Sequence, residues 1–136
     1  MNPIVRNIVA VVAGVILGMI ANMGLITISG SIIPPPEGVN PADMESIKAN
    51  FHLFEAKHYI FPFLAHAMGS FFGALVAAWI AVSRKMKFAM GLGLFTMLGG
   101  IAACFLIPAP TWFIVADLAL AYIPFAYLAG RIAERK

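Results

Sequence analysis

Charged residues are scarce in this sequence. Of its 136 residues, 11% are charged and 62% are hydrophobic, whereas soluble domains contain about 25% charged and about 45–50% apolar residues. This shortage of charge excludes an ordinary soluble enzyme and a disordered tail. It also excludes a nucleic-acid-binding protein, although the net charge is +3. We therefore expect the lipid bilayer to be the main surroundings of this chain.

Side chains that bind metals or carry redox chemistry are also few. The single cysteine, Cys104, excludes an internal disulfide and any site that needs several cysteines. Three histidines are too few for the histidine-rich metal centres of membrane desaturases and hydroxylases. We therefore expect no cofactor.

Four long apolar segments fill most of the chain. A membrane-spanning helix needs about 20 mainly apolar residues, and its backbone groups must be satisfied within the segment. We predict one all-α integral membrane domain, 1–136, with four transmembrane helices. Their approximate ranges are 8–33, 59–82, 88–107 and 111–129. The first segment starts like a signal peptide, but it is too long and lacks a clear cleavage site. Pro124 predicts a kink in the last segment.

The basic residues predict the orientation, because lysine and arginine are enriched on the cytoplasmic side of membrane proteins. Only Lys48 and Lys57 fall in the segment 34–58, between the first two spans. The other basic residues fall on the opposite side: Arg6, Arg84, Lys85, Lys87, Arg131, Arg135 and Lys136. Both termini are therefore expected in the cytoplasm, and residues 34–58 outside.

The outside loop carries the pattern of a short amphipathic helix lying at the membrane interface. Asn40-Pro41 is a favourable helix start, since asparagine caps a helix and proline suits its first position. Apolar residues and one histidine then follow at three- and four-residue spacing: Met44, Ile47, Phe51, Phe54 and His58. This helix is either a connector seated on the bundle or a lid over a site between the spans.

The same loop contains the pattern H-x-x-E-x-x-H, formed by His52, Glu55 and His58. On a helix, consecutive members stand one turn apart and are able to share a metal ion. Carboxylate di-metal bundles need further carboxylates from other helices, and the spans offer only Asp117. We therefore favour solvated or interfacial side chains over a metal site.

Small residues recur every four positions in the first two spans. The rows are Ala10, Gly14, Gly18 and Asn22, and Ala65, Gly69, Gly73 and Ala77. Such rows let helix backbones approach closely in lipid. They predict a tight contact between the first two spans, or a homo-oligomer formed through one of these faces.

Polar residues inside the spans form a predicted layer. His66 and Asp117 lie about seven and six residues from the outer ends of their spans, roughly 10 Å deep. Asn22 and Thr96 count to a similar or slightly greater depth. Ionisable groups are costly in lipid and are functional candidates by default. Each of the four helices thus contributes one polar group to the outer half of the bilayer.

Two accounts of this layer stay open. In the structural account, His66 and Asp117 pair across the bundle and Asn22 completes their hydrogen bonds. In the functional account, the layer lines a pocket for a small solute, a lipid-like ligand or a proton, and Ser70 and Tyr122 extend it inward. A histidine beside an aspartate is suited to passing a proton near neutral pH. Catalysis by this pair, or by a metal on the H-x-x-E-x-x-H group, is a third interpretation.

The two halves of the chain show similar spacing. Asn22-Met23 and Thr96-Met97 each stand twelve residues before the Pro34 and Pro108 that close the first and third spans. Two parallel hairpin repeats would place a shared site on their common axis, as in transporters built from repeats.

The strings SGSIIPPPEG, FEAKHYIFPFLAHAMG and IPAPTWF resemble segments of small, uncharacterised four-helix bacterial membrane proteins. The resemblance implies a multi-pass protein of the bacterial inner membrane, with the lipid bilayer as its partner, and it implies no activity. We predict a protein that binds or conducts a small solute, lipid-like ligand or proton at an outward-facing pocket. The alternative is an accessory or structural membrane subunit whose polar layer serves packing only.

Overall fold

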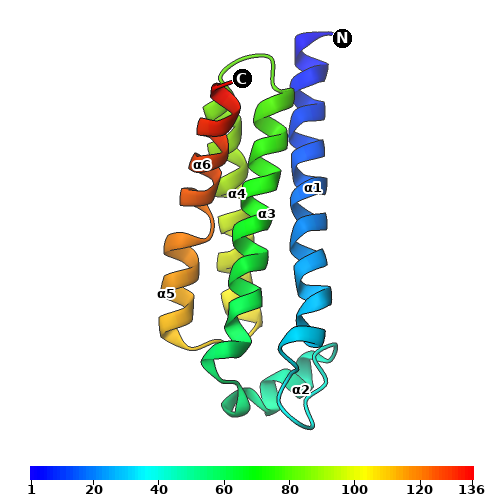
Figure 1. Cartoon of the computed structure of the whole chain (residues 1–136), viewed down its shortest axis with the longest axis vertical. Coiled ribbons are helices and arrows are strands. Elements are labelled where there is room, and N and C mark those ends of the chain that lie inside the picture. The colour runs from blue at the N-terminus through cyan, green and yellow to red at the C-terminus, as the bar shows by residue number, and fades with distance from the viewer.

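The computed structural model describes residues 1–136, and its regular secondary structure is helical, without strands (Figure 1). Four segments are long and apolar enough to cross a membrane, which confirms this part of the predicted fold class. They consist of α1 (Pro3–Ile32), α3 (Ile60–Ile80), α4 (Lys85–Leu106), and α5 (Thr111–Leu120) followed by α6 (Ile123–Glu134). The loop between α1 and α3 contains α2 (Met44–Ala49) and the 3-10 turns η1 (Phe51–Leu53) and η2 (Ala56–Tyr59).

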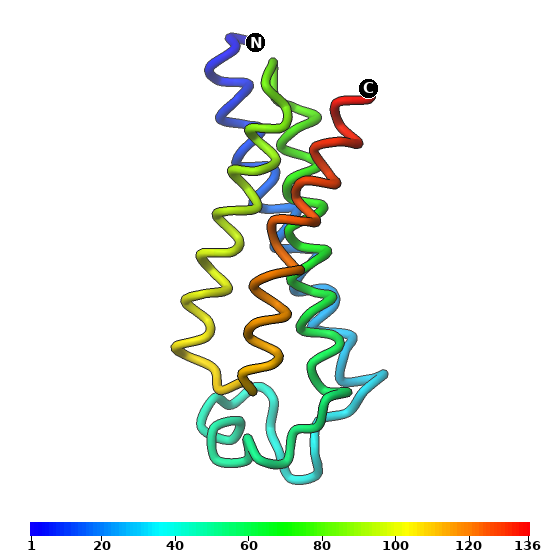
Figure 2. The backbone as a smooth tube through the Cα atoms, turned by 90° about the vertical axis from the view of Figure 1, so that its left-hand side faces the viewer, coloured from blue at the N-terminus to red at the C-terminus, as the bar shows by residue number.

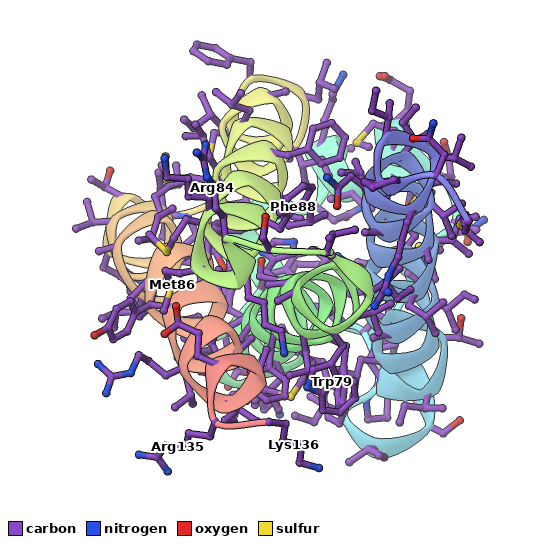
Figure 3. The ribbon with its side chains drawn as sticks, turned by 90° about the horizontal axis from the view of Figure 1, so that it is seen from above. Trp79, Arg84, Met86, Phe88, Arg135 and Lys136 are labelled. Atoms are coloured by element: carbon purple, nitrogen blue, oxygen red, sulfur yellow. The ribbon has the colours of Figure 1, made fainter.

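Helix α3 is the central element of the bundle. It packs against α1, α4 and α6, and α4 packs against α6. Helix α1 touches α4 only slightly, and the view along the bundle shows α1 on one side of α3 and α6 on the other (Figure 3). This arrangement leaves the space between α1 and α4 without a close helix–helix contact.

The predicted contact between the first two spans is confirmed. A Cβ atom built at Gly18 would lie 2.7 Å from the carbonyl oxygen of Gly69, and one at Gly14 would lie 2.7 Å from that of Gly73. The two backbones therefore meet directly, as small-residue faces permit in lipid. Both rows are used within one chain, so a homo-oligomer, which stays a prediction, would need other faces.

The half of the bundle that contains the termini is closed by an alanine-rich core. Its buried residues come from α3, α4 and α6 and are Ala74, Leu75, Ala77, Ala78, Ala89, Leu92, Ala126, Ala129 and Ala133. Short side chains let the three helices approach closely. The buried polar side chains, Ser70 and Asp117, lie outside this core.

The last span is interrupted between α5 and α6. Pro124 lies in the first turn of α6, at a position that tolerates proline, and the backbone leaves the helix at Ala121 and Tyr122. The predicted kink at Pro124 is therefore present as a full break. It turns Tyr122 toward the interior, where the residue is only 2% exposed.

Both termini and the turn between α3 and α4 lie at the same end of the bundle, and the α1–α3 loop lies at the other (Figures 1 and 2). Arg6 donates from Nε to the carbonyl oxygen of Ile80 at 2.6 Å, and Asn7 accepts from the backbone N–H of Val82 at 3.1 Å. Lys136 lies over the ring of Trp79 at 5.6 Å (Figure 3). Side-chain contacts thus fasten α1 and the C-terminus to this end of α3.

Candidate functional site

The His66 imidazole and the Asp117 carboxylate are in direct contact. Nδ1 of His66 lies 2.9 Å from each oxygen of Asp117. The hydroxyl of Tyr122 donates to Oδ2 of Asp117 at 2.9 Å. Asp117 is only 3% exposed, so these two partners satisfy a carboxylate that is shielded from solvent. The expected pairing of His66 with Asp117 is therefore present, and Tyr122 completes it.

The contacts of His66 orient its ring. When Asp117 is ionised, its oxygens only accept hydrogen bonds, and Nδ1 of His66 is then the donor of this bond. Tyr122 stacks on the imidazole, with ring centroids 5.6 Å apart and an interplanar angle of 25°. Nε2 has no partner within the chain, and the His66 side chain is 25% exposed. The geometry therefore leaves one imidazole nitrogen free to meet a ligand.

One cavity lies between His66 and the α1–α3 loop, and we call it the loop-side cavity. It has a volume of about 380 Å³, and its polar lining includes His66 and Asp117. The loop contributes Ile47, Phe51, Phe54 and His58, and α5 contributes Phe113 and Ile114. Four of the five residues in the predicted amphipathic stripe thus line this cavity, and the loop covers a space between the helices.

A second cavity, the lateral cleft, lies between α1, α3 and α4. Its volume is about 310 Å³. Its lining includes Met19, Asn22 and Met23 of α1, His66, Gly69 and Ser70 of α3, and Phe95, Thr96 and Gly99 of α4. His66, Gly100 and Ala103 line both cavities. His66 therefore stands where the two spaces meet.

The remaining polar residues of the predicted layer lie along the lateral cleft. Ser70 and Thr96 are joined by a hydrogen bond of 2.9 Å between their hydroxyl oxygens. The Thr96 hydroxyl shares its one proton between the backbone carbonyls of Leu92 and Gly93, so in the bond between the two hydroxyls it accepts from Ser70. Asn22 forms no hydrogen bond with His66 or Asp117, and the expectation that it completes their network is wrong. Its position beside Gly69 on the tight α1–α3 contact directs it toward the cleft instead.

The H-x-x-E-x-x-H group does not lie on one continuous helix. Helix α2 is capped by Asp43 rather than by Asn40, whose side chain accepts from the N–H of Ala42 in a local turn. His52 lies in η1, and Glu55 stands between η1 and η2. Nδ1 of His58 accepts from the backbone N–H of Glu55 at 2.8 Å. No three such side chains gather into a metal-binding group.

Gly100 is a further site residue that the sequence analysis did not identify. The phenol of Tyr122 packs directly against its Cα, and a Cβ atom at this position would overlap the ring and its hydroxyl. Gly100 thus makes room for the group that binds Asp117. Thr96, Gly100 and Cys104 recur every four positions in the sequence, which indicates a helix face of small residues. That spacing does not reveal that Tyr122 is the residue packed against Gly100.

No protein family model, curated protein or solved structure matches this chain. The resemblance to small bacterial membrane proteins therefore stays a prediction. The functional argument rests on the geometry of His66 and its two cavities.

Proposed function

We propose that this chain is a membrane protein that binds a small molecule at the Nε2 atom of His66. The observation that carries the proposal is the arrangement of this one ring. Asp117 and Tyr122 hold it on one side, and its second nitrogen is unpartnered between two cavities. A fixed imidazole at the polar end of a mainly apolar cavity is typical of a ligand site.

The proposal favours binding over conduction. Along the bundle, the polar side chains that line the lateral cleft extend from His66 to the Ser70–Thr96 pair. Beyond them, toward the termini, α3, α4 and α6 pack through the alanine-rich core. A conduction path for ions or protons needs polar groups or water across the whole membrane. The closed half therefore supports a site with no passage toward the end that bears the termini.

We further propose that the end bearing both termini is cytoplasmic and that the membrane is the bacterial inner membrane. Seven basic residues belong to this end, and Lys48 and Lys57 belong to the opposite loop, which also holds four acids. This asymmetry is the one that orients multi-pass proteins. The loop-side cavity then faces the outside.

The proposal is tested with His66→Asn. The asparagine amide can reproduce the donor at Nδ1 and keep Asp117 satisfied, but it has no counterpart of Nε2. The matched control is His52→Asn, because His52 is exposed in the loop. Wild type and both variants are purified in mild detergent from the same host and compared by native mass spectrometry. We expect a small molecule to stay bound to wild type and His52→Asn and to be lost from His66→Asn.

A second measurement reports on Nε2 itself. Diethyl pyrocarbonate acylates accessible, unprotonated imidazole nitrogens, and peptide mass spectrometry locates the adduct. We expect His66 to react in the folded protein once the bound molecule is removed. Identical bound molecules in wild type and His66→Asn, together with an unreactive His66, would overturn the proposal.

The second candidate is a structural subunit in which the polar layer serves packing only. One observation favours it: every deeply buried side-chain nitrogen and oxygen atom has a hydrogen-bond partner. This function predicts that His66→Asn, which keeps the bond to Asp117, shows the same bound molecules as wild type in native mass spectrometry.

A further inference from the structure

Two residues that line the lateral cleft carry a polar group that no residue of the chain satisfies. One is Nε2 of His66, and the other is the side-chain amide of Asn22, which lies well inside α1. An amide or imidazole in an apolar environment is costly unless a hydrogen bond compensates it. Both groups line the same cavity, so one ligand is able to meet both.

The mouth of the cleft is apolar and faces sideways. Met19, Met23 and Phe95 are 62%, 58% and 57% exposed. They lie within the apolar lengths of α1 and α4, both long enough to cross a membrane. Gly99 adds open space, because nothing lies within 4 Å of a Cβ atom built there. At this depth the surroundings are lipid chains, so the cleft opens to the bilayer.

We propose that the ligand of the His66 site is an uncharged amphiphile that enters from the bilayer through the lateral cleft. Its polar head binds Nε2 of His66 and the amide of Asn22, and its apolar chain lies in the cleft beside Phe95 and the two methionines. This inference rests on the proposed function, since it names the ligand class of the same site.

The charges around the site favour an uncharged head. His66 is already paired with the carboxylate of Asp117, and a second anion would lie close to that carboxylate. The loop over the neighbouring cavity carries Glu37, Asp43, Glu45 and Glu55 against only Lys48 and Lys57. A hydroxyl head needs no countercharge, because it donates to an imidazole nitrogen and accepts from an amide N–H.

The test uses 1-dodecanol with a photoreactive diazirine in its chain, added to the full-length protein in lipid nanodiscs. We expect crosslinks on α1 near Met19 and Met23 and on α4 near Phe95. Gly99→Leu places an apolar side chain at the cleft, at a position where a Cβ atom meets nothing within 4 Å, and it should lower this labelling about tenfold. Gly91→Leu is the matched control, because Gly91 is equally open on the same helix and does not line the cleft.

The outcomes separate this inference from the proposed function. If Gly99→Leu labels like wild type while His66→Asn abolishes labelling, lateral entry through the cleft is wrong and the His66 site stands. If His66→Asn leaves labelling unchanged while Gly99→Leu removes it, the cleft holds lipid chains without the His66 site, and both proposals fail. Stronger labelling by the matching diazirine dodecanoic acid would overturn the uncharged head.

Discussion

The hydroxyl of Tyr122 donates a 2.9 Å hydrogen bond to Asp117, five residues earlier in the chain. On a straight helix, residues five apart point about 140° away from each other, at about 100° per residue. The bond exists because the helix breaks between α5 and α6, where Pro124 begins the new segment. The break thus brings the hydroxyl of Tyr122 within hydrogen-bonding distance of the buried Asp117 carboxylate.

We expect Tyr122→Phe to lower the free energy of unfolding by about 1 kcal/mol, because Asp117 loses a buried donor. Thermal unfolding in detergent measures this change. Tyr127→Phe is the control: Tyr127 is exposed on α6 and its hydroxyl contacts only Arg131. Equal midpoints for the two variants would show that the Tyr122 bond contributes nothing.

We expect Gly100→Ala to be destabilising by about 1–3 kcal/mol, the usual range for overpacking. The added methyl group would overlap the phenol of Tyr122 and push it away from Asp117. Gly99→Ala changes the neighbouring position, which faces open space, and should be neutral or slightly stabilising through helix propensity. The measurement compares the thermal unfolding midpoints of the two variants. A Gly100→Ala variant as stable as wild type would contradict the close packing of Tyr122 against Gly100.

The α1–α3 contact is tested by Gly18→Ala. Its methyl group would lie 2.7 Å from the carbonyl oxygen of Gly69, so the helices must separate, and we expect a loss of about 1–3 kcal/mol. Gly24→Ala, on the same helix and facing open space, is the matched control. The same loss in both variants would mean that the glycine contact is not the cause.

Asp117→Ala leaves both Nδ1 of His66 and the hydroxyl of Tyr122 without an acceptor. We expect a loss of about 1–3 kcal/mol. In the double variant with His66→Ala, the loss should be smaller than the sum of the single losses, because residues in one network couple. Additive losses in thermal unfolding would show that the two side chains do not interact.

The orientation is tested in a Cys104→Ala background with single cysteines at Glu37 and Ser83, which are exposed at opposite ends of the bundle. If the basic end is cytoplasmic, a membrane-impermeant maleimide labels Glu37→Cys in intact cells. It labels Ser83→Cys only after the membrane is opened. The reverse pattern would overturn the proposed topology.

The sequence was sufficient to predict the four helices, because each apolar segment is long and bounded by charges or prolines. It was less informative about the loop. Asn40-Pro41 has the composition of a helix start, yet the Asn40 side chain bonds to the N–H of Ala42 and the helix begins only after Asp43. Local composition does not decide between two neighbouring caps that compete for the same backbone groups.

The depth of the site residues along the bundle was predictable from the sequence, but the direction in which each helix turns its side chains was not. Counting residues from the ends placed His66 and Asp117 at one level, because the helical rise is constant, and the two residues do meet. Which way each helix turns is set by packing between helices. For this reason the expectation for Asn22 failed, and the role of Gly100 beside Tyr122 was not foreseen.

Helix α1 packs into the bundle through very few residues. Of its thirty residues, only Ala10, Gly14 and Gly18 are buried. The rest of its length is exposed or only partly buried. The stability of the fold should therefore tolerate apolar substitutions over much of α1 and be lost at these three positions, so most of this helix is able to change in sequence while the backbone contact with α3 is kept.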